Sequence, residues 1–287
     1  MIDRYAERIK TAYAERVKTG IIRPMVLSLY SLLFIPFSLY AWEYESQATE
    51  TTQNVQIRLG AEATKKWNNG LRLGLEQELY SDVYNSATGP AFRTSFTTLC
   101  FAYHPIEYVK LDVGYVLKIN GPLSTWSAAK KADPNEWIRH RVFASVTGSY
   151  STRYVKLYLR ERALMEIRTD SINPLEKSQY AWQLRSRLGA DILIPGKPVK
   201  PYIWCELVNT LNTPEYQRKN GHQFITMVRP QVGIKWRISK LSSLDFYYRF
   251  IYEYDRDVNI TKKNGYIELT EKRDFTHAIG VAYNINW

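Results

Sequence analysis

Basic residues spaced two positions apart are the feature of this sequence best suited to chemistry. Three such pairs are arginines, a fourth joins a lysine to an arginine, and Arg249 adds a further guanidinium. The pairs are Arg139 and Arg141, Arg160 and Arg162, Arg185 and Arg187, and Lys235 and Arg237. A guanidinium donates two parallel hydrogen bonds to a carboxylate, sulfate or phosphate group. Residues at i and i+2 share one face of a strand, so the pairs predict basic walls that bind anions.

The segments around these pairs alternate apolar and polar residues, as β-strands with one apolar face do. We predict eleven such strands, at roughly 54–65, 70–80, 92–102, 108–118, 137–149, 154–168, 180–194, 202–209, 224–238, 244–254 and 274–287. The apolar faces carry one charged residue, Glu161, whereas the polar faces carry 17 basic and nine acidic residues. The polar faces therefore have a large positive excess.

Two all-β architectures produce this pattern. In a soluble sandwich or lipocalin-like barrel the apolar faces point inward, whereas in an outer-membrane barrel they point outward to lipid. The strands reach the roughly 9–11 residues that a tilted strand needs to cross a bilayer. The apolar faces are also rich in aromatic rings such as Trp182, Trp236 and Phe246, which suit membrane interfaces. We therefore predict a single-chain transmembrane antiparallel β-barrel. A mean hydropathy of −0.37 fits it, because half of each strand faces water.

Residues 1–41 predict a leader that is removed before folding. The apolar stretch 25–41 follows Arg23 and ends at the small Ala41, as a secretory signal peptide does; the alternative is an N-terminal membrane anchor. Because residues 1–41 hold six basic and three acidic residues, their removal lowers the formal net charge from +11 to +8. Residues 42–287 then form the barrel domain.

The connections between strands set the predicted strand count. Tight turns near 67–70, 104–107, 151–153, 195–198 and 239–241 alternate with longer connections near 81–91, 119–136, 169–179, 210–223 and 255–273. Outer-membrane barrels place short turns in the periplasm and long loops outside. An additional strand at 42–47 would give about twelve strands, and ten is the alternative. We read Pro230 as a bulge and place Cys100 and Cys205 on apolar faces.

Several short strings resemble an uncharacterised family of predicted Gram-negative outer-membrane β-barrels, known only as a domain of unknown function. They are Trp137–Val142, Arg160–Arg162, Leu184–Gly189, Tyr247–Arg249 and the aromatic end of the last strand. The resemblance covers most of 42–287 and implies a barrel in the bacterial outer membrane. It implies no activity and no catalytic residues.

The C-terminus also resembles the signal that the barrel-assembly machinery reads. Tyr283, Ile285 and Trp287 alternate at the end of the chain, and Gly280 lies upstream. Ala278 stands where that signal usually has a basic residue, so the match is partial. The resemblance implies that the assembly machinery and outer-membrane lipid are partners.

The preferred function is a narrow basic channel or binding tunnel for small anionic solutes, with Arg139, Arg141, Arg160, Arg162, Arg185, Arg187, Lys235, Arg237 and Arg249 as its anion-binding residues. The alternative is a closed structural or surface-interaction barrel without transport, in which carboxylates pair with these arginines.

A membrane-embedded hydrolase is a third reading, but none of the four histidines, His104, His140, His222 and His277, adjoins a nucleophile motif. We therefore expect no enzyme activity. We expect no cofactor, no metal and no nucleic-acid partner. The string Asp255–Asn259 spaces oxygen atoms like the start of a calcium loop, but Ile260 replaces the required glycine, and we read it as a solvated loop.

Overall fold

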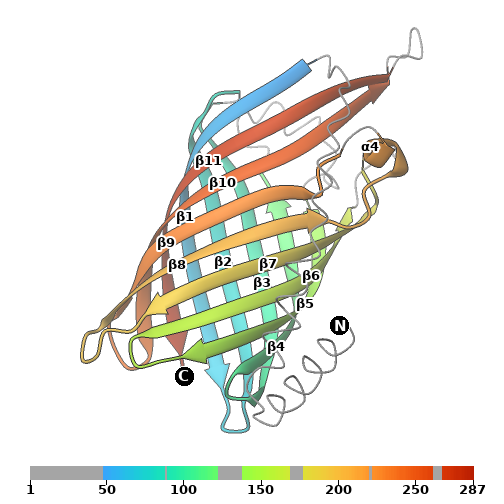
Figure 1. Ribbon diagram of the computed structural model, residues 1–287. Helices are drawn as coiled ribbons and strands as arrows, with labels where there is room; N and C mark the ends of the chain where they lie inside the picture. The colour runs from blue at the N-terminus through green and yellow to red at the C-terminus, as the bar shows by residue number, and fades with distance from the viewer. Residues whose placement is uncertain (1–47, 88, 122–137, 169–176, 220–221, 261–266) are drawn as a thin grey trace, which may run out of the picture. The chain divides into compact units, whose positions relative to one another are not determined.

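A computed structural model describes residues 48–87, 89–121, 138–168, 177–219, 222–260 and 267–287. These residues form a barrel wall of eleven β-strands and one short helix, α4 (Glu215–Lys219) (Figure 1). The strands are β1 (Ala48–Lys66), β2 (Leu71–Asn85), β3 (Ala91–Ile106), β4 (Val109–Asn120), β5 (Ile138–Ser151), β6 (Val155–Arg168), β7 (Tyr180–Ile192), β8 (Val199–Thr210), β9 (Ile225–Arg237), β10 (Ser242–Ile260) and β11 (Ile267–Asn286). No helix among them is both long and apolar enough to cross a membrane. The predicted leader lies outside the described residues.

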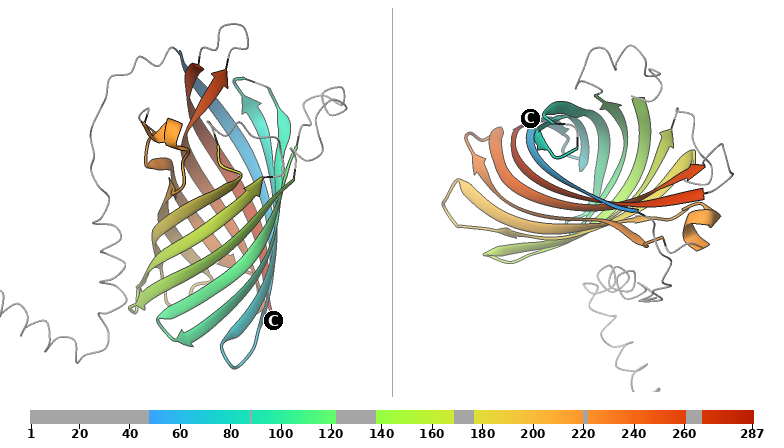
Figure 2. Two further views of the ribbon diagram at one scale, coloured as in Figure 1. Left: turned by 90° about the vertical axis from the view of Figure 1, so that its right-hand side faces the viewer. Right: turned by 90° about the horizontal axis from the view of Figure 1, so that it is seen from above.

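The strands close into a cylinder in which each is hydrogen-bonded to its neighbours in sequence (Figure 2). The neighbours are antiparallel, except that β1 and β11 pair in parallel from Ala48 and Thr270 to Thr64 and Asn286. An odd number of strands in a closed up-and-down barrel requires one parallel pair, because the first and last strands run in the same direction.

The predicted barrel is confirmed, and its strand count is corrected from about twelve to eleven. The sequence argument assumed an even number, which requires antiparallel closure. β1 pairs with both β2 and β11, so the described wall leaves no edge for another strand. The predicted strand at 42–47 lies outside the described residues.

The apolar faces point outward, as the alternation predicts. Leu157, Leu188 and Phe246 are 42%, 59% and 44% exposed, whereas the inward Glu206 on β8 is 1% exposed. A cylinder with an apolar exterior and a charged interior is the arrangement of a membrane β-barrel.

For one strand, β3, the sequence argument assigned the wrong residues to the outward face. Leu99, Phe101 and Tyr103 are exposed, and Cys100 points inward beside the buried cluster of Val116, Phe143 and Leu164. A register shift at Tyr80/Ser81 skips Arg93 on β3, and one extra residue reverses the faces beyond it. Cys205 is exposed on the outer face of β8, as predicted.

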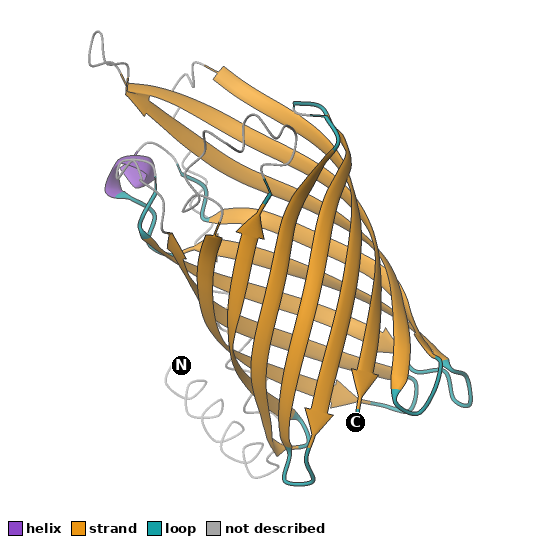
Figure 3. Ribbon diagram, turned by 180° about the vertical axis from the view of Figure 1, so that it is seen from behind, coloured by secondary structure: helices purple, strands orange, loops and turns teal. Residues whose placement is uncertain are grey.

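The two ends of the barrel differ in their connections (Figure 3). At one end, called here the short-turn end, lie the turns 67–70, 107–108, 152–154, 193–198 and 238–241. At the other, the long-loop end, the strands extend further than predicted. Asp255–Asn259 belongs to β10 rather than to a loop, and Asp255 and Asp257 lie 3.1 Å and 3.8 Å from Lys177 Nζ.

Pro230 is not a bulge. The register of β9 with β10 is the same on both sides of it, but the pairing stops between Arg249 and Tyr252. Proline lacks the N–H group that would bond to β10, which explains the gap. The bulge of this region is at Thr226 on β9, which the pairing skips between Val208–Met227 and Asn209–Ile225.

Inward aromatic rings lie against glycines of the neighbouring strand at four directly paired positions. The pairs are Phe143 with Gly114, Tyr158 with Gly189, Tyr202 with Gly233 and Tyr247 with Gly280. A Cβ at Gly233 would lie 2.6 Å from Tyr202 Cζ, so no larger residue fits. The tertiary structure thus gives Gly280 a packing role that is independent of the proposed assembly signal.

Candidate functional site: a charged cavity inside the barrel

The inward side chains of the barrel surround a cavity of about 560 Å³. Eleven basic and seven acidic residues line it. The basic ones are Arg58, Arg93, Lys110, Lys118, Arg141, Arg160, Arg162, Arg185, Arg187, Arg229 and Arg249. Alternation positions them, because every second residue of a strand faces the interior. The cavity is therefore polar, with more basic than acidic side chains.

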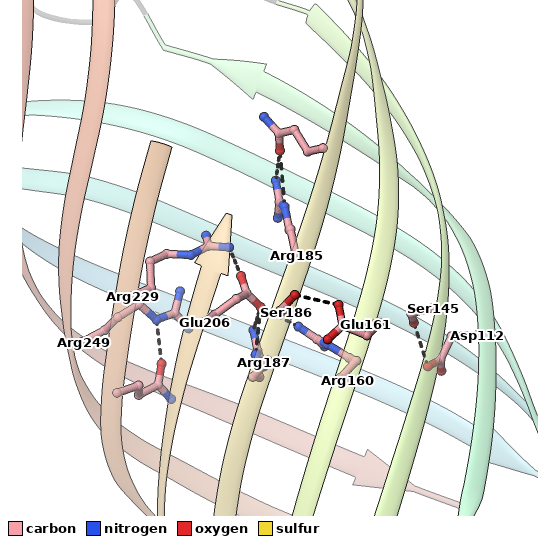
Figure 4. Close-up of polar contacts among 12 residues, drawn as sticks. Asp112, Ser145, Arg160, Glu161, Arg185, Ser186, Arg187, Glu206, Arg229 and Arg249 are labelled. Atoms are coloured by element: carbon pink, nitrogen blue, oxygen red, sulfur yellow. Dashed lines mark hydrogen bonds and ion pairs between the residues drawn. The ribbon is translucent and has the colours of Figure 1, made fainter. Parts of the chain in front are cut away.

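One carboxylate, that of Glu206, forms ion pairs with three of these arginines. Glu206 Oε2 lies 2.8 Å from Arg160 Nη2 and 2.7 Å from Arg187 Nη2, and Glu206 Oε1 bonds to Arg229 (Figure 4). The four side chains form one row across β6, β7, β8 and β9, because Arg160 pairs with Arg187, Arg187 with Glu206 and Glu206 with Arg229. Trp204 supports the row, since the Arg187 guanidinium lies 3.9 Å from its ring centroid.

A second carboxylate, that of Glu166, binds the basic pair predicted on β5, Arg139 and Arg141. Glu166 on β6 accepts a hydrogen bond of 3.1 Å from Arg139 and one of 2.6 Å from Arg141 Nε. Arg168 Nε lies 3.5 Å from the same carboxylate. Glu166 is 3% exposed. Arg139 and Arg141 are thus held by a carboxylate, whose single negative charge offsets part of the three positive charges around it.

Four arginines of the cavity have no carboxylate oxygen within 4.0 Å among the described residues. Amide oxygens and rings hold three of them. Arg185 donates to Gln183 Oε1 at 2.9 Å, Arg249 donates to Gln231 Oε1 at 2.6 Å, and the Arg162 guanidinium lies 4.0 Å from the Phe143 ring centroid. An amide positions a guanidinium without cancelling its charge.

Arg58 is the fourth of these arginines. It donates to Gln56 Oε1 at 2.8 Å and lies 3.9 Å from the Tyr80 ring centroid. It is 4% exposed. Arg58 was predicted to face the interior but was not among the predicted anion-binding residues.

The nine predicted anion-binding residues thus divide into three groups. Arg139, Arg141, Arg160 and Arg187 are paired with carboxylates, and Arg162, Arg185 and Arg249 line the cavity without one. Lys235 and Arg237 lie elsewhere, at the short-turn end. Sequence reasoning missed the central role of Glu166, since Arg139 and Arg141 lie on another strand, β5, and only the register brings them to it.

The histidines lie away from this cavity. His140 and His277 contact the hydroxyls of Tyr115 and Tyr248, respectively, on the outer face. His222 lies against Tyr254 near α4, with ring centroids 6.3 Å apart. Burial and the nearby Arg256 lower the pKa of His222 below its usual value. Among the described residues, no group of three or more His, Cys, Asp or Glu side chains could hold a metal.

A family model for a protein of unknown function, DUF2490, matches residues 48–261. The chain belongs to the DUF2490 family. That assignment agrees with the resemblance seen in the sequence, and it carries no activity. Among proteins with curated descriptions, none matches this DUF2490 member.

Among solved structures, a porin named NanC is similar. The two chains are 12% identical with a TM-score of 0.43, and the match covers 79% of this chain and 97% of the porin. So weak a likeness bears on neither solute nor mechanism.

Proposed function

We propose that this DUF2490 barrel lies in the bacterial outer membrane and passes or binds small anionic solutes through its interior. The observation that carries the proposal is the set of four cavity arginines without carboxylate partners, Arg58, Arg162, Arg185 and Arg249. A buried guanidinium with no carboxylate in contact is costly, and a solute carboxylate, sulfate or phosphate group would supply that contact. Rings of such residues select anions in pores.

The arginines that pair with carboxylates agree with part of the alternative, the closed barrel, because they occupy space inside it. Glu166 and Glu206 fix six arginines against the wall. These ion pairs fill part of the interior and stiffen it. In our proposal they are the frame of the cavity, whereas the unpaired arginines contact the solute.

Location and assembly are parts of the same proposal. The outward apolar faces support a lipid environment, and the predicted leader supports export. The C-terminal residues Tyr283, Ile285 and Trp287 would engage the barrel-assembly machinery. Trp287 is near the short-turn end, where its backbone N–H bonds to Thr64 and its carbonyl oxygen accepts from Lys66.

The reversal potential of the refolded barrel in a planar bilayer under a potassium chloride gradient tests the proposal. We expect a current that prefers chloride. The double substitution Arg185→Gln/Arg249→Gln should shift the reversal potential toward zero, because it removes two unpaired charges and leaves no orphaned carboxylate. Arg218→Gln/Lys219→Gln, in the last turn of α4, is the matched control, since it removes the same charge outside the cavity.

Two outcomes would contradict the proposal. A preference for potassium would exclude an anion path. Absence of current, together with no binding of isethionate or other small organic anions in ligand-observed NMR, would favour the closed barrel.

A further inference from the structure

A second cavity, of about 620 Å³, lies at the short-turn end of the barrel. Six basic residues line it, namely Arg153, Lys197, Lys200, Lys235, Arg237 and Lys240, and none of its lining residues, all of them in the described part of the chain, is acidic. It therefore differs in kind from the central cavity, which acidic side chains share. Its volume is in the range of small-molecule sites.

Only one of these six cations is neutralised within the described structure. Lys200 Nζ lies 2.9 Å from Asp191 Oδ2. The other five have no carboxylate oxygen within 4.0 Å among the described residues. Lys235 Nζ instead lies 5.2 Å from the Tyr202 ring centroid, and the Arg153 guanidinium lies 5.3 Å from that of Tyr154. Like charges gathered around one cavity repel, and an anion between them relieves that repulsion.

The cations come from three separate turn regions, which bears on the kind of ligand that would meet them. Arg153 lies in the turn between β5 and β6, Lys197 between β7 and β8, and Lys240 between β9 and β10, just beyond Lys235 and Arg237 at the end of β9. A single phosphate group offers one centre of charge to these cations. A ligand with several anionic groups can meet cations on more than one turn at once, and the arrangement therefore favours such a ligand.

We propose that the short-turn cavity is a binding site for a small polyanion that carries three or more clustered phosphate groups. This site is separate from the central cavity and does not depend on the proposed passage of anions. A soluble polyphosphate and the clustered phosphates of lipid headgroups share the required chemistry. Lysine and arginine both bind phosphate, lysine as a point charge and arginine as a planar fork.

Isothermal titration of the full barrel, refolded in zwitterionic micelles, with tripolyphosphate and with orthophosphate tests the site. We expect tripolyphosphate to bind at least about tenfold more tightly, because it meets several cations at once, and its affinity should fall as salt rises. Equal affinities for the two ligands would overturn the proposal.

Substitutions locate the site. Lys235→Gln/Arg237→Gln should weaken tripolyphosphate binding roughly tenfold, the sum of two partly exposed charge contacts. Neither residue has a carboxylate oxygen within 4.0 Å among the described residues, although Asp245 lies opposite Lys235 on β10. Folding should therefore persist, as circular dichroism will check. Arg218→Gln/Lys219→Gln is the control of equal charge and should bind as the wild type does. If the control weakens tripolyphosphate binding equally, the effect comes from the net charge of the protein and not from this cavity. If only Arg185→Gln/Arg249→Gln weakens tripolyphosphate binding, the polyanion binds in the central cavity instead. Either result would overturn the proposal.

Lipid nanodiscs distinguish the two sources of phosphate. In phosphatidylcholine discs tripolyphosphate should bind as in micelles. A lipid with clustered phosphates is then added to the discs. If it competes with tripolyphosphate, the cavity binds lipid headgroups; if it does not, the cavity binds soluble polyanions. Absence of tripolyphosphate binding in phosphatidylcholine discs would overturn the proposal.

Discussion

Glu206 and Glu161 are two carboxylates on opposite faces of the same wall, and their surroundings could hardly differ more (Figure 4). Glu206 faces inward from β8 and has three arginines around it. Glu161 faces outward from the middle of β6, where Ser186 on β7 donates one hydrogen bond of 2.6 Å to Oε2. Its Oε1 is buried without a hydrogen-bond partner among the described residues.

The comparison teaches that the direction of the side chain, more than the residue type, sets what a carboxylate does in this protein. Inside, a negative charge balances clustered guanidinium groups and holds four strands together. Outside, among apolar side chains, an ionisable group is costly, and the single hydroxyl of Ser186 offsets only part of the cost. Three substitutions test this difference.

Glu206→Gln should have the largest effect. It leaves Arg160, Arg187 and Arg229 without their counter-charge and should lower the free energy of unfolding by about 3–5 kcal/mol. Urea titration in lipid vesicles, followed by tryptophan fluorescence, measures the loss. Glu215→Gln is the control, because its pair with Lys219 is exposed and should contribute less than about 0.5 kcal/mol. A loss as small as that of the control would mean that water already screens the row.

Glu161→Leu should act in the opposite direction. It replaces a carboxyl by an apolar group on the lipid-facing side and should raise the free energy of unfolding by about 1–2 kcal/mol. The same titration measures it. A fall in stability would mean that Glu161 has a polar partner in the membrane. The contrast drawn here between the inward and the outward carboxylate would then be wrong.

Ser186→Ala should have the smallest effect. It removes the one hydrogen bond to Glu161 and should lower the free energy of unfolding by about 1 kcal/mol. In a Glu161→Leu background the serine has no carboxyl to bond, so the loss should vanish. A loss of equal size in both backgrounds would show that Ser186 acts through packing instead.

Much of the architecture could be predicted from local pattern. Alternation placed Arg160, Arg162, Arg185 and Arg187 on the inner face and Glu161 on the outer one, because a strand has only two faces. The prediction failed at β3, where the bulge at Arg93 reversed the faces and turned Cys100 inward. It also failed for Asp255–Asn259, because pairing with β11 extends β10 through residues whose composition is typical of a loop.

The candidate site could be predicted only in part. The sequence identified the arginines but could not tell which are free. Arg187 and Arg185 lie two positions apart on one strand, yet the first bonds to the carboxylate of Glu206, whereas the second bonds to an amide oxygen.

By itself the sequence determined that eleven segments become strands with one apolar and one charged face, since that property is local and repeats every two residues. Only the tertiary structure decided that an odd number of strands closes through a parallel pair, and which arginines meet a carboxylate. Both depend on the register between strands, which the alternation within one strand does not determine.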